Sequence, residues 1–337
     1  MTQLVPLPSH STGVPWSTLS WPRTPLAPRD AEAFTRRANA LFSLTAAQGV
    51  TYALLVVQRG QLIYEQYAAG ANDFYLQYSW SMAKSITQAL VGILVRQGRI
   101  DIHAPAPVPE WQSPGDARRA ITLDQLLQMR SGLQFAEDYV DGGVSDVIPM
   151  LNLHGRFDTG AFAAGKPLVH PPGTFFSYSS GTTNIICRIL RDIVGPPTQM
   201  LAFMQDELFE PIGMRTMLPK FDRSGTFVGS SYCLASPQDF ARFGYLYLRD
   251  GVWDGRRILP EGWVDYARTP SHATALEAYG AHWWLTSGTP RFYAGGYDGQ
   301  RIFVDPEKDL VIVRCGRTPV AEAPFLWKQI DSLVELL

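Results

Sequence analysis

The clearest pattern of apolar and polar residues in the chain lies between Ser81 and Gln97. Its apolar side chains recur at helical spacing and surround nearly the whole circumference, which predicts a buried helix rather than a surface helix. Gly98 follows directly, and a glycine in this place commonly ends a helix. Ser81 is therefore expected at the N-terminal tip of a central helix.

Strand patterns occur toward both ends of the chain. Residues 52–57 and 62–67 are rich in β-branched and apolar residues and predict a hairpin that turns at Arg59-Gly60. Further strands are predicted over residues 281–286, 291–294, 300–304 and 310–313. The predicted helices 31–48 and 324–337 flank these strands. We therefore expect one antiparallel sheet, assembled from both ends of the chain and flanked by the terminal helices.

The middle of the chain is predicted to be mostly helical. The helical segments are residues 122–129, 183–194, 199–208, 237–249 and 261–267. The fold class is thus α/β (α+β), with residues 1–75 and 235–337 expected to form an α/β domain and residues 76–234 a mostly helical domain. Residues 1–30 are rich in Pro, Ser and Thr and predict an extended arm, which covers the fold or reaches a neighbouring molecule.

Composition and charge exclude several classes of function. The 337 residues carry 29 basic and 31 acidic side chains, so there is no electrostatic case for binding nucleic acid or an anionic membrane. No apolar run reaches the ~18 residues of a membrane span. The N-terminal segment lacks the pattern of a signal peptide, so a cytoplasmic location is expected. Cys187, Cys233 and Cys315 are widely separated and are predicted to be buried free thiols.

Common motifs of enzymes and metal sites are absent from the sequence. The chain has no GxSxG, no HExxH, no P-loop and no GxGxxG after a predicted strand. Its six histidines show no spacing typical of metal ligands, so no metal site is expected.

The remaining candidate is Ser81-Met82-Ala83-Lys84, at the start of the predicted buried helix. Residues three apart share a helix face, so the Ser81 hydroxyl and the Lys84 amine can meet. The helix N-terminus would stabilise an oxyanion and disfavour charge on the amine, so that a desolvated lysine accepts the serine proton. The alternative is a capping serine followed by an ordinary lysine. Lys84 is, however, one of only five lysines and lies in the helix predicted to be most buried.

Further segments follow this motif in a recognisable order. They read ITLDQLL followed by SGL within residues 121–133, PGTFFSYSS at 172–180, SPQDFARFG at 236–244 and GYDGQ at 296–300. Together with residues 81–84 they resemble the motifs of the serine β-lactamase and penicillin-binding superfamily, over roughly residues 35–335. The resemblance implies the serine β-lactamase-like fold, in which an antiparallel sheet flanked by terminal helices carries an inserted, mostly helical domain with the SxxK and YxS motifs. The site would lie in the cleft between the two parts.

Within the superfamily the chain is most similar to the class C-like branch, which includes carboxylesterases and 6-aminohexanoate-dimer hydrolases. The similarity lies in Glu137-Asp138-Tyr139-Val140-Asp141, in Tyr178 with serine rather than asparagine at Ser180, in Trp283-Trp284 and in Gly299-Gln300. It implies a serine hydrolase that cleaves small carboxylic esters or linear amides through an acyl-enzyme, without a metal or organic cofactor. The natural substrate and the oligomeric state stay open.

The resemblance also implies roles for individual residues. Ser81 would be the acylated nucleophile, Lys84 the base that activates it, and Tyr178 the group that passes a proton to the leaving group. The backbone N–H groups of Ser81 and Tyr297 would form the oxyanion hole. Lys84 and Tyr178 would titrate as a coupled pair, so either could be the general base. Substrate contacts are expected from Tyr139, Ser180, Gly295, Gly296, Trp283 and Trp284. Because neighbouring residues of a strand point to opposite faces, one tryptophan should face the helices and the other the outside or the cleft.

Two departures from the superfamily pattern bear on the substrate. Ala294-Gly295-Gly296 stands where β-lactamases carry Lys-Thr-Gly, so this strand offers no cation for a β-lactam carboxylate; Arg301 is near, with its orientation open. Ser180 replaces the asparagine of the second motif and removes an amide donor. Both changes argue against a β-lactamase or D-amino-acid peptidase, which remains the alternative. A further alternative is a non-catalytic binding or sensor protein on the same fold.

Overall fold

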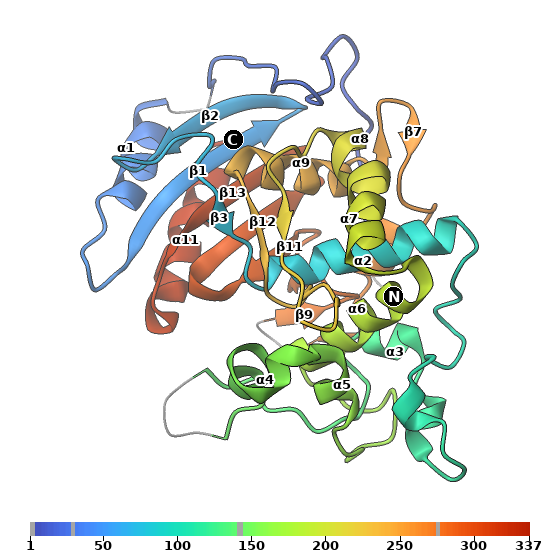
Figure 1. Ribbon diagram of the computed structural model, residues 1–337. Helices are drawn as coiled ribbons and strands as arrows, with labels where there is room; N and C mark the ends of the chain where they lie inside the picture. The colour runs from blue at the N-terminus through green and yellow to red at the C-terminus, as the bar shows by residue number, and fades with distance from the viewer. Residues whose placement is uncertain (1–3, 28–30, 140–143, 274–276) are drawn as a thin grey trace.

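The central layer of the structure is an eight-stranded antiparallel sheet (Figure 1). The computed structural model describes residues 4–27, 31–139, 144–273 and 277–337. The strands are, in spatial order, β2 Gln61–Tyr67, β1 Val50–Gln58, β13 Leu310–Arg317, β12 Gln300–Asp305, β11 Phe292–Gly296, β10 Trp284–Thr286, β9 Glu277–Tyr279 and β8 His272–Ala273. Pairing of β1 with β13 joins the N-terminal hairpin to the C-terminal strands, as the sequence predicts.

Helices cover both faces of this sheet. α1 Ala31–Phe42 and α11 Ala323–Val334 pack together on one face, where they bury one apolar cluster. α2 Met82–Arg96 and α9 Pro237–Leu248 pack on the other face, in the larger apolar cluster (Figure 1). β1 is covered on both sides, which explains why its sequence is a continuous apolar run without alternation.

The remaining α-helices and short strands lie between β2 and β10 in the sequence. The helices are α3 Leu123–Leu127, α4 Val147–Asn152, α5 Thr159–Ala164, α6 Ser180–Val194, α7 Pro197–Met204, α8 Glu210–Ile212 and α10 Trp263–Arg268. The strands are β3 Gln77–Tyr78, β5 Cys233–Ala235 and β4 Leu218–Pro219 in one small sheet, and β6 Val252–Trp253 and β7 Arg256–Arg257 in another. α4 and α5 have no counterpart among the predicted helices. α2 is buried along almost its full length, as its sequence predicts.

The first helix is shorter than predicted. It ends at Phe42 rather than at residue 48, because Thr45 and Gln48 bond to each other through their side chains and form a separate turn. Gly49 then starts the entry to β1 with a φ of +107°, and an added Cβ there would lie 2.1 Å from the Arg317 carbonyl oxygen. The close approach of the two strands therefore requires glycine at this position.

The strand predicted over residues 281–286 also begins later. The N–H of His282 donates to the Leu127 carbonyl at 3.1 Å, and His282 has a φ of +56°. Strand β10 therefore begins only at Trp284.

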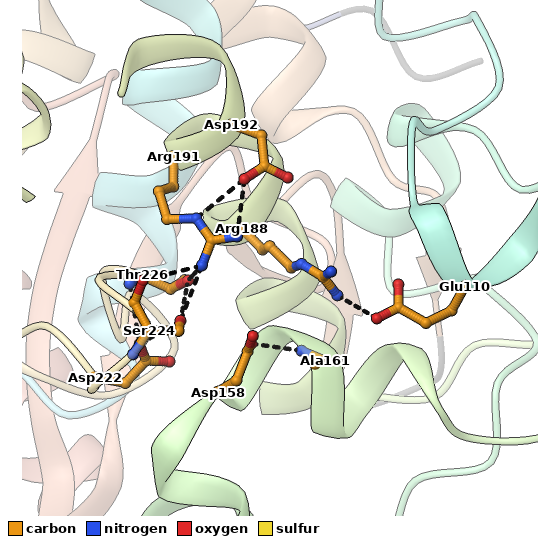
Figure 2. A network of polar contacts seen from close by, with 9 residues as sticks. All are labelled: Glu110, Asp158, Ala161, Arg188, Arg191, Asp192, Asp222, Ser224 and Thr226. Carbon is orange, nitrogen blue, oxygen red and sulfur yellow. Dashed lines mark hydrogen bonds and ion pairs between the residues drawn. The ribbon is translucent and has the colours of Figure 1, made fainter. Parts of the chain in front are cut away.

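Charged side chains fasten the C-terminal half of α6 (Figure 2). Arg188 forms an ion pair with Glu110 at 2.6 Å. Arg191 donates to the hydroxyls of Ser224 and Thr226, each at 2.9 Å. These contacts tie α6 to two segments that are distant in sequence, and they help to fix the helix whose opposite end enters the candidate site.

The N-terminal arm covers the fold. Residues 4–27 form no helix or strand, and their only sheet-like pairing is an isolated bridge between Arg23 and Leu62. Their backbone carbonyl groups accept hydrogen bonds from arginines in α9 and at its C-terminal end. Arg242 donates to the Ser17 carbonyl at 2.8 Å, and Arg249 donates to the Pro8 carbonyl at 2.9 Å. Of the two arrangements predicted for the arm, the structure has the one in which it lies on its own chain.

Other sequence-based expectations concern the thiols, the membrane and the domains. All three cysteines are buried and free, as predicted. None of the helices in the described ranges is both long and apolar enough to cross a membrane. The division into domains at residues 75 and 235 stays a prediction.

Candidate active site

Ser81 is the N-cap residue of α2 and follows the short strand β3. The preceding residue, Trp80, has a φ of +43°, a left-handed conformation that residues other than glycine rarely adopt. Ser79 forms two hydrogen bonds with Cys233 of β5. Its N–H donates to the Cys233 carbonyl at 2.8 Å, and its hydroxyl accepts from the Cys233 N–H at 3.0 Å. A neighbouring strand therefore fixes the turn that presents Ser81.

Lys84 lies one turn further along α2 and is only 1% exposed. Its Nζ lies 3.1 Å from Ser81 Oγ, 2.9 Å from Ser180 Oγ and 2.9 Å from the Ser230 carbonyl oxygen. Burial lowers the pKa of Lys84 from 10.5 to about 8, against a smaller opposing effect of the Glu137 charge. About one tenth of the amine is therefore neutral at pH 7, beside a serine hydroxyl, far more than at the ordinary pKa.

Tyr178 joins this group from the loop before α6. Its ring centroid lies 4.8 Å from Lys84 Nζ, and its hydroxyl interacts with the Ser81 side chain. Burial raises the pKa of Tyr178 above its ordinary value of 10.0, so the phenol keeps its proton at neutral pH. The three residues chosen from sequence thus meet in the structure.

A carboxylate to which the sequence assigned no role, Glu137, anchors the start of α6. The Ser180 N–H donates to Glu137 Oε2 at 2.7 Å, and the Ser180 hydroxyl donates to Oε1. The Tyr139 hydroxyl donates to the same Oε1 at 3.1 Å. The place of Glu137 two residues before Tyr139 is the signal that could have revealed it, since alternate residues of an extended segment point the same way. Val140 and Asp141, from the same motif, lie outside the described residues.

The C-terminal end of β11 approaches the turn that holds Ser81. A Cβ added at Gly296 would lie 2.4 Å from the Ser79 carbonyl oxygen, so a larger residue there must displace one of the two chains. The approach brings Tyr297, the second residue expected at the oxyanion hole, beside Trp80, with 5.9 Å between the ring centroids.

Trp283 and Trp284 differ in their surroundings. Trp283 is fully buried, and its ring centroid lies 4.4 Å from that of Tyr247 in α9. The substrate contact predicted for Trp283 is therefore wrong, because its indole belongs to the core. Trp284 is half-buried, 5.1 Å from the Tyr178 ring, and 3.4 Å from the place of a Cβ added at Gly295. Of this pair, only Trp284 lies beside the catalytic candidates.

The arginine nearest to the third motif points elsewhere. The Arg301 guanidinium carbon lies 3.8 Å from the Tyr293 ring centroid and 3.3 Å from that of Trp327 in α11. Its charge is thus stacked between the sheet and α11. Residues 294–296 of β11 bring no charge of their own. In the part of the chain that the structure describes, no three His, Cys, Asp or Glu side chains are grouped as a metal ion would need.

Aromatic side chains gather around Trp80, directly before Ser81. Tyr78 and Tyr232 have ring centroids 5.4 Å and 5.9 Å from that of Trp80. Tyr297 contacts Trp80 and also lies 5.3 Å from the Tyr139 ring. We call Tyr78, Trp80, Tyr139, Tyr232 and Tyr297 the aromatic rim. Tyr78 and Tyr297 are exposed, so the rim presents apolar surface to an incoming ligand.

Comparison with known proteins places the chain in a family. A family model described as Beta-lactamase matches residues 38–331. The chain belongs to the beta-lactamase family. A 6-aminohexanoate-dimer hydrolase of Paenarthrobacter ureafaciens is 25% identical over an alignment of 302 residues, which covers 80% of this chain and 73% of that protein. This beta-lactamase-family chain is a serine hydrolase, in agreement with the arrangement of Ser81 and Lys84.

Solved structures share the fold. A Bacillus anthracis protein provisionally named 6-aminohexanoate-dimer hydrolase matches with a TM-score of 0.77 and 24% identity, over 99% of this chain and 91% of that one. A family VIII carboxylesterase matches with a TM-score of 0.68 and 15% identity, over 94% of this chain and 99% of that one. The predicted serine β-lactamase-like fold is therefore confirmed.

Proposed function

We propose that the protein hydrolyses small carboxylic esters or linear amides through an acyl-enzyme on Ser81. The observation that carries this proposal is the buried Lys84 amine 3.1 Å from the Ser81 hydroxyl, with its pKa lowered to about 8. A neutral amine at this distance accepts the serine proton while Oγ bonds to the substrate carbonyl carbon.

Lys84 rather than Tyr178 serves as the base in this proposal. Burial lowers the pKa of the Lys84 amine and raises the pKa of the Tyr178 phenol, so near neutral pH the amine can lose its proton while the phenol cannot. Tyr178 then acts as a proton donor. It gives its proton to the leaving group as the bond between carbonyl carbon and leaving group breaks, and it regains one from the Lys84 ammonium.

Deacylation follows the same proton path in reverse. Water attacks the acyl carbon and gives a proton to the neutral Lys84 amine. The ester bond then breaks, and the Lys84 ammonium returns that proton to Ser81 Oγ. The backbone N–H groups of Ser81 and Tyr297 would stabilise the negative charge on the carbonyl oxygen in both half-reactions.

The surroundings favour apolar contact with the substrate. The aromatic rim offers apolar contact next to Ser81, and neither Arg301 nor residues 294–296 supply a cation there. By its name, one relative hydrolyses the 6-aminohexanoate dimer, an amide, and by its name one solved structure is a carboxylesterase. Both names agree with the cleavage of an ester or amide bond.

A substrate panel tests the proposal. Short-chain p-nitrophenyl esters and the linear 6-aminohexanoate dimer are incubated with the wild type and with Ser81→Ala, and nitrocefin is run in parallel. The proposal expects turnover of an ester or of the dimer by the wild type, none by the variant, and slow or no nitrocefin turnover. Nitrocefin as the best substrate would indicate a β-lactamase, and no turnover of any compound would favour a binding protein.

A further inference from the structure

Glu137 lies behind Ser180, and its hydrogen bonds have a fixed direction. An ionised carboxylate can only accept hydrogen bonds. It accepts from the Ser180 N–H at 2.7 Å, from the Ser180 hydroxyl, and from the Tyr139 hydroxyl at 3.1 Å. The single hydrogen of the Ser180 hydroxyl is therefore committed to Glu137, and toward every other neighbour that oxygen can only accept.

This direction determines how a neutral Lys84 must be oriented. A neutral amine has two hydrogens and one lone pair. Ser180 Oγ and the Ser230 carbonyl oxygen, each 2.9 Å from Nζ, can only accept, so each takes one amine hydrogen. The lone pair is left for the third neighbour, the Ser81 hydroxyl at 3.1 Å. This is the orientation in which the amine can take the serine proton.

We propose that Glu137 is a positioning residue that, through Ser180, turns the lone pair of the neutral Lys84 amine toward the Ser81 hydroxyl. The inference rests on the proposed function, in which Ser81 is the nucleophile and Lys84 the base. Without the carboxylate, the Ser180 hydroxyl is free to donate to the Lys84 lone pair. The amine would then present a hydrogen to Ser81 and could not act as a base toward it.

The same carboxylate orients the neutral Lys84 amine but also disfavours its neutral form. Its negative charge raises the pKa of the amine, so removing it should increase the neutral fraction at a given pH. The other titratable groups facing Lys84 are Tyr178, Cys187 and His282. Burial raises the pKa of Tyr178 and of Cys187, the latter to about 12, and lowers the pKa of His282 to about 3, so all three stay neutral between pH 6 and 9. Of these four groups, Glu137 alone alters the pH midpoint when its charge is removed.

The experiment measures kcat/KM for a short-chain p-nitrophenyl ester from pH 6 to 10 in the full chain. The glutamine of Glu137→Gln can donate to Ser180 Oγ and thereby release the serine hydrogen. We expect the plateau of kcat/KM to fall about tenfold or more, because orientation of the base is lost, while the pH midpoint moves below that of the wild type. A residue that only supports the fold would lower the rate without moving the midpoint in this direction.

A double-mutant cycle tests whether Ser180 transmits the effect. Ser180→Ala should lower the plateau by itself, and Glu137→Gln added to Ser180→Ala should cause little further loss. Ser180→Ala also keeps the carboxylate, so it provides the test if Glu137→Gln does not fold. Its plateau should then fall without the downward shift of the midpoint. The matched control is Glu110→Gln, which breaks the ion pair with Arg188 (Figure 2), about two helical turns beyond Ser180 in α6, and should leave the midpoint unchanged.

The outcomes separate this inference from the proposed function. An inactive wild type would overturn the proposed function and the inference with it. An active wild type combined with a Glu137→Gln plateau within twofold of it would overturn the inference alone. Two other results would also overturn the inference alone. One is that the losses of kcat/KM from Glu137→Gln and Ser180→Ala multiply in the double variant, and the other is a Ser180→Ala plateau equal to that of the wild type.

Discussion

Replacement of Gly296 by alanine should damage catalysis far more than the same replacement at its neighbour, Gly295. The Cβ added at position 296 would lie 2.4 Å from the Ser79 carbonyl oxygen. An unstrained contact needs about 3.5 Å, so one of the two chains must move by about 1 Å. Gly296 has a φ of −124°, which alanine adopts freely, so the effect is steric.

A shift of either chain displaces part of the candidate site. One chain leads to Ser81 and the other to Tyr297, and a displacement of about 1 Å costs on the order of 100-fold in rate. At Gly295 the nearest atom to an added Cβ is 3.3 Å away, in the Tyr293 ring, which can yield by a few tenths of an ångström. We therefore expect kcat/KM to fall by roughly 30- to 100-fold for Gly296→Ala and by less than about threefold for Gly295→Ala.

The assay is ester hydrolysis at fixed pH, with a thermal melt of each variant. Overpacking should also cost Gly296→Ala about 1–3 kcal/mol of unfolding free energy, so activity is measured well below the melting temperature. Wild-type activity in Gly296→Ala, or an equal loss in Gly295→Ala, would refute the close approach of β11 to the Ser81 turn.

Three further predictions concern the pH profile, Tyr178 and the pair Trp283 and Trp284. The kcat/KM of the wild type should rise from pH 6 and level off above a midpoint near 8, because only the neutral Lys84 amine accepts a proton; a flat profile for an uncharged ester, corrected for spontaneous hydrolysis, would contradict such a base. Tyr178→Phe should lower the turnover of amides at least about tenfold more than that of p-nitrophenyl esters, since only the amine leaving group needs a donated proton; equal losses would argue against a donor role. Trp283→Ala should cost about 3–5 kcal/mol of unfolding free energy in a urea titration, whereas Trp284→Ala should cost less and raise KM; the reverse order would contradict the burial of the two indoles.

Six of the eight strands of the sheet could be predicted from sequence because these strands and their turns are locally encoded, whereas β8 and β9 have no predicted counterpart. The apolar run of β1 and the turn at Arg59-Gly60 specify the hairpin without distant contacts. The end of α1 was misplaced because two side chains, Thr45 and Gln48, compete with the helix through bonds of their own. The start of β10 depends on a bond from His282 to the distant Leu127, which no local pattern reveals.

The candidate site was predictable to the extent that helical spacing dictates it. Ser81 and Lys84 share a helix face, so their contact follows from the sequence alone. Ser230 contributes a backbone carbonyl, which every residue type carries, and therefore leaves no signal in the sequence. Glu137 meets Ser180 across 43 residues, a contact that only the tertiary fold creates. The role of Trp283 was misjudged because the register of β10 decides which indole is buried.

The measurement that tests the central claim most directly is the reaction of the wild type with a fluorophosphonate, followed by intact mass and peptide mapping. The account predicts a single adduct on Ser81, formed at a rate that falls at least about 100-fold in Lys84→Met, because the base is removed. An adduct on another serine, no adduct, or labelling of Lys84→Met at the wild-type rate would contradict it.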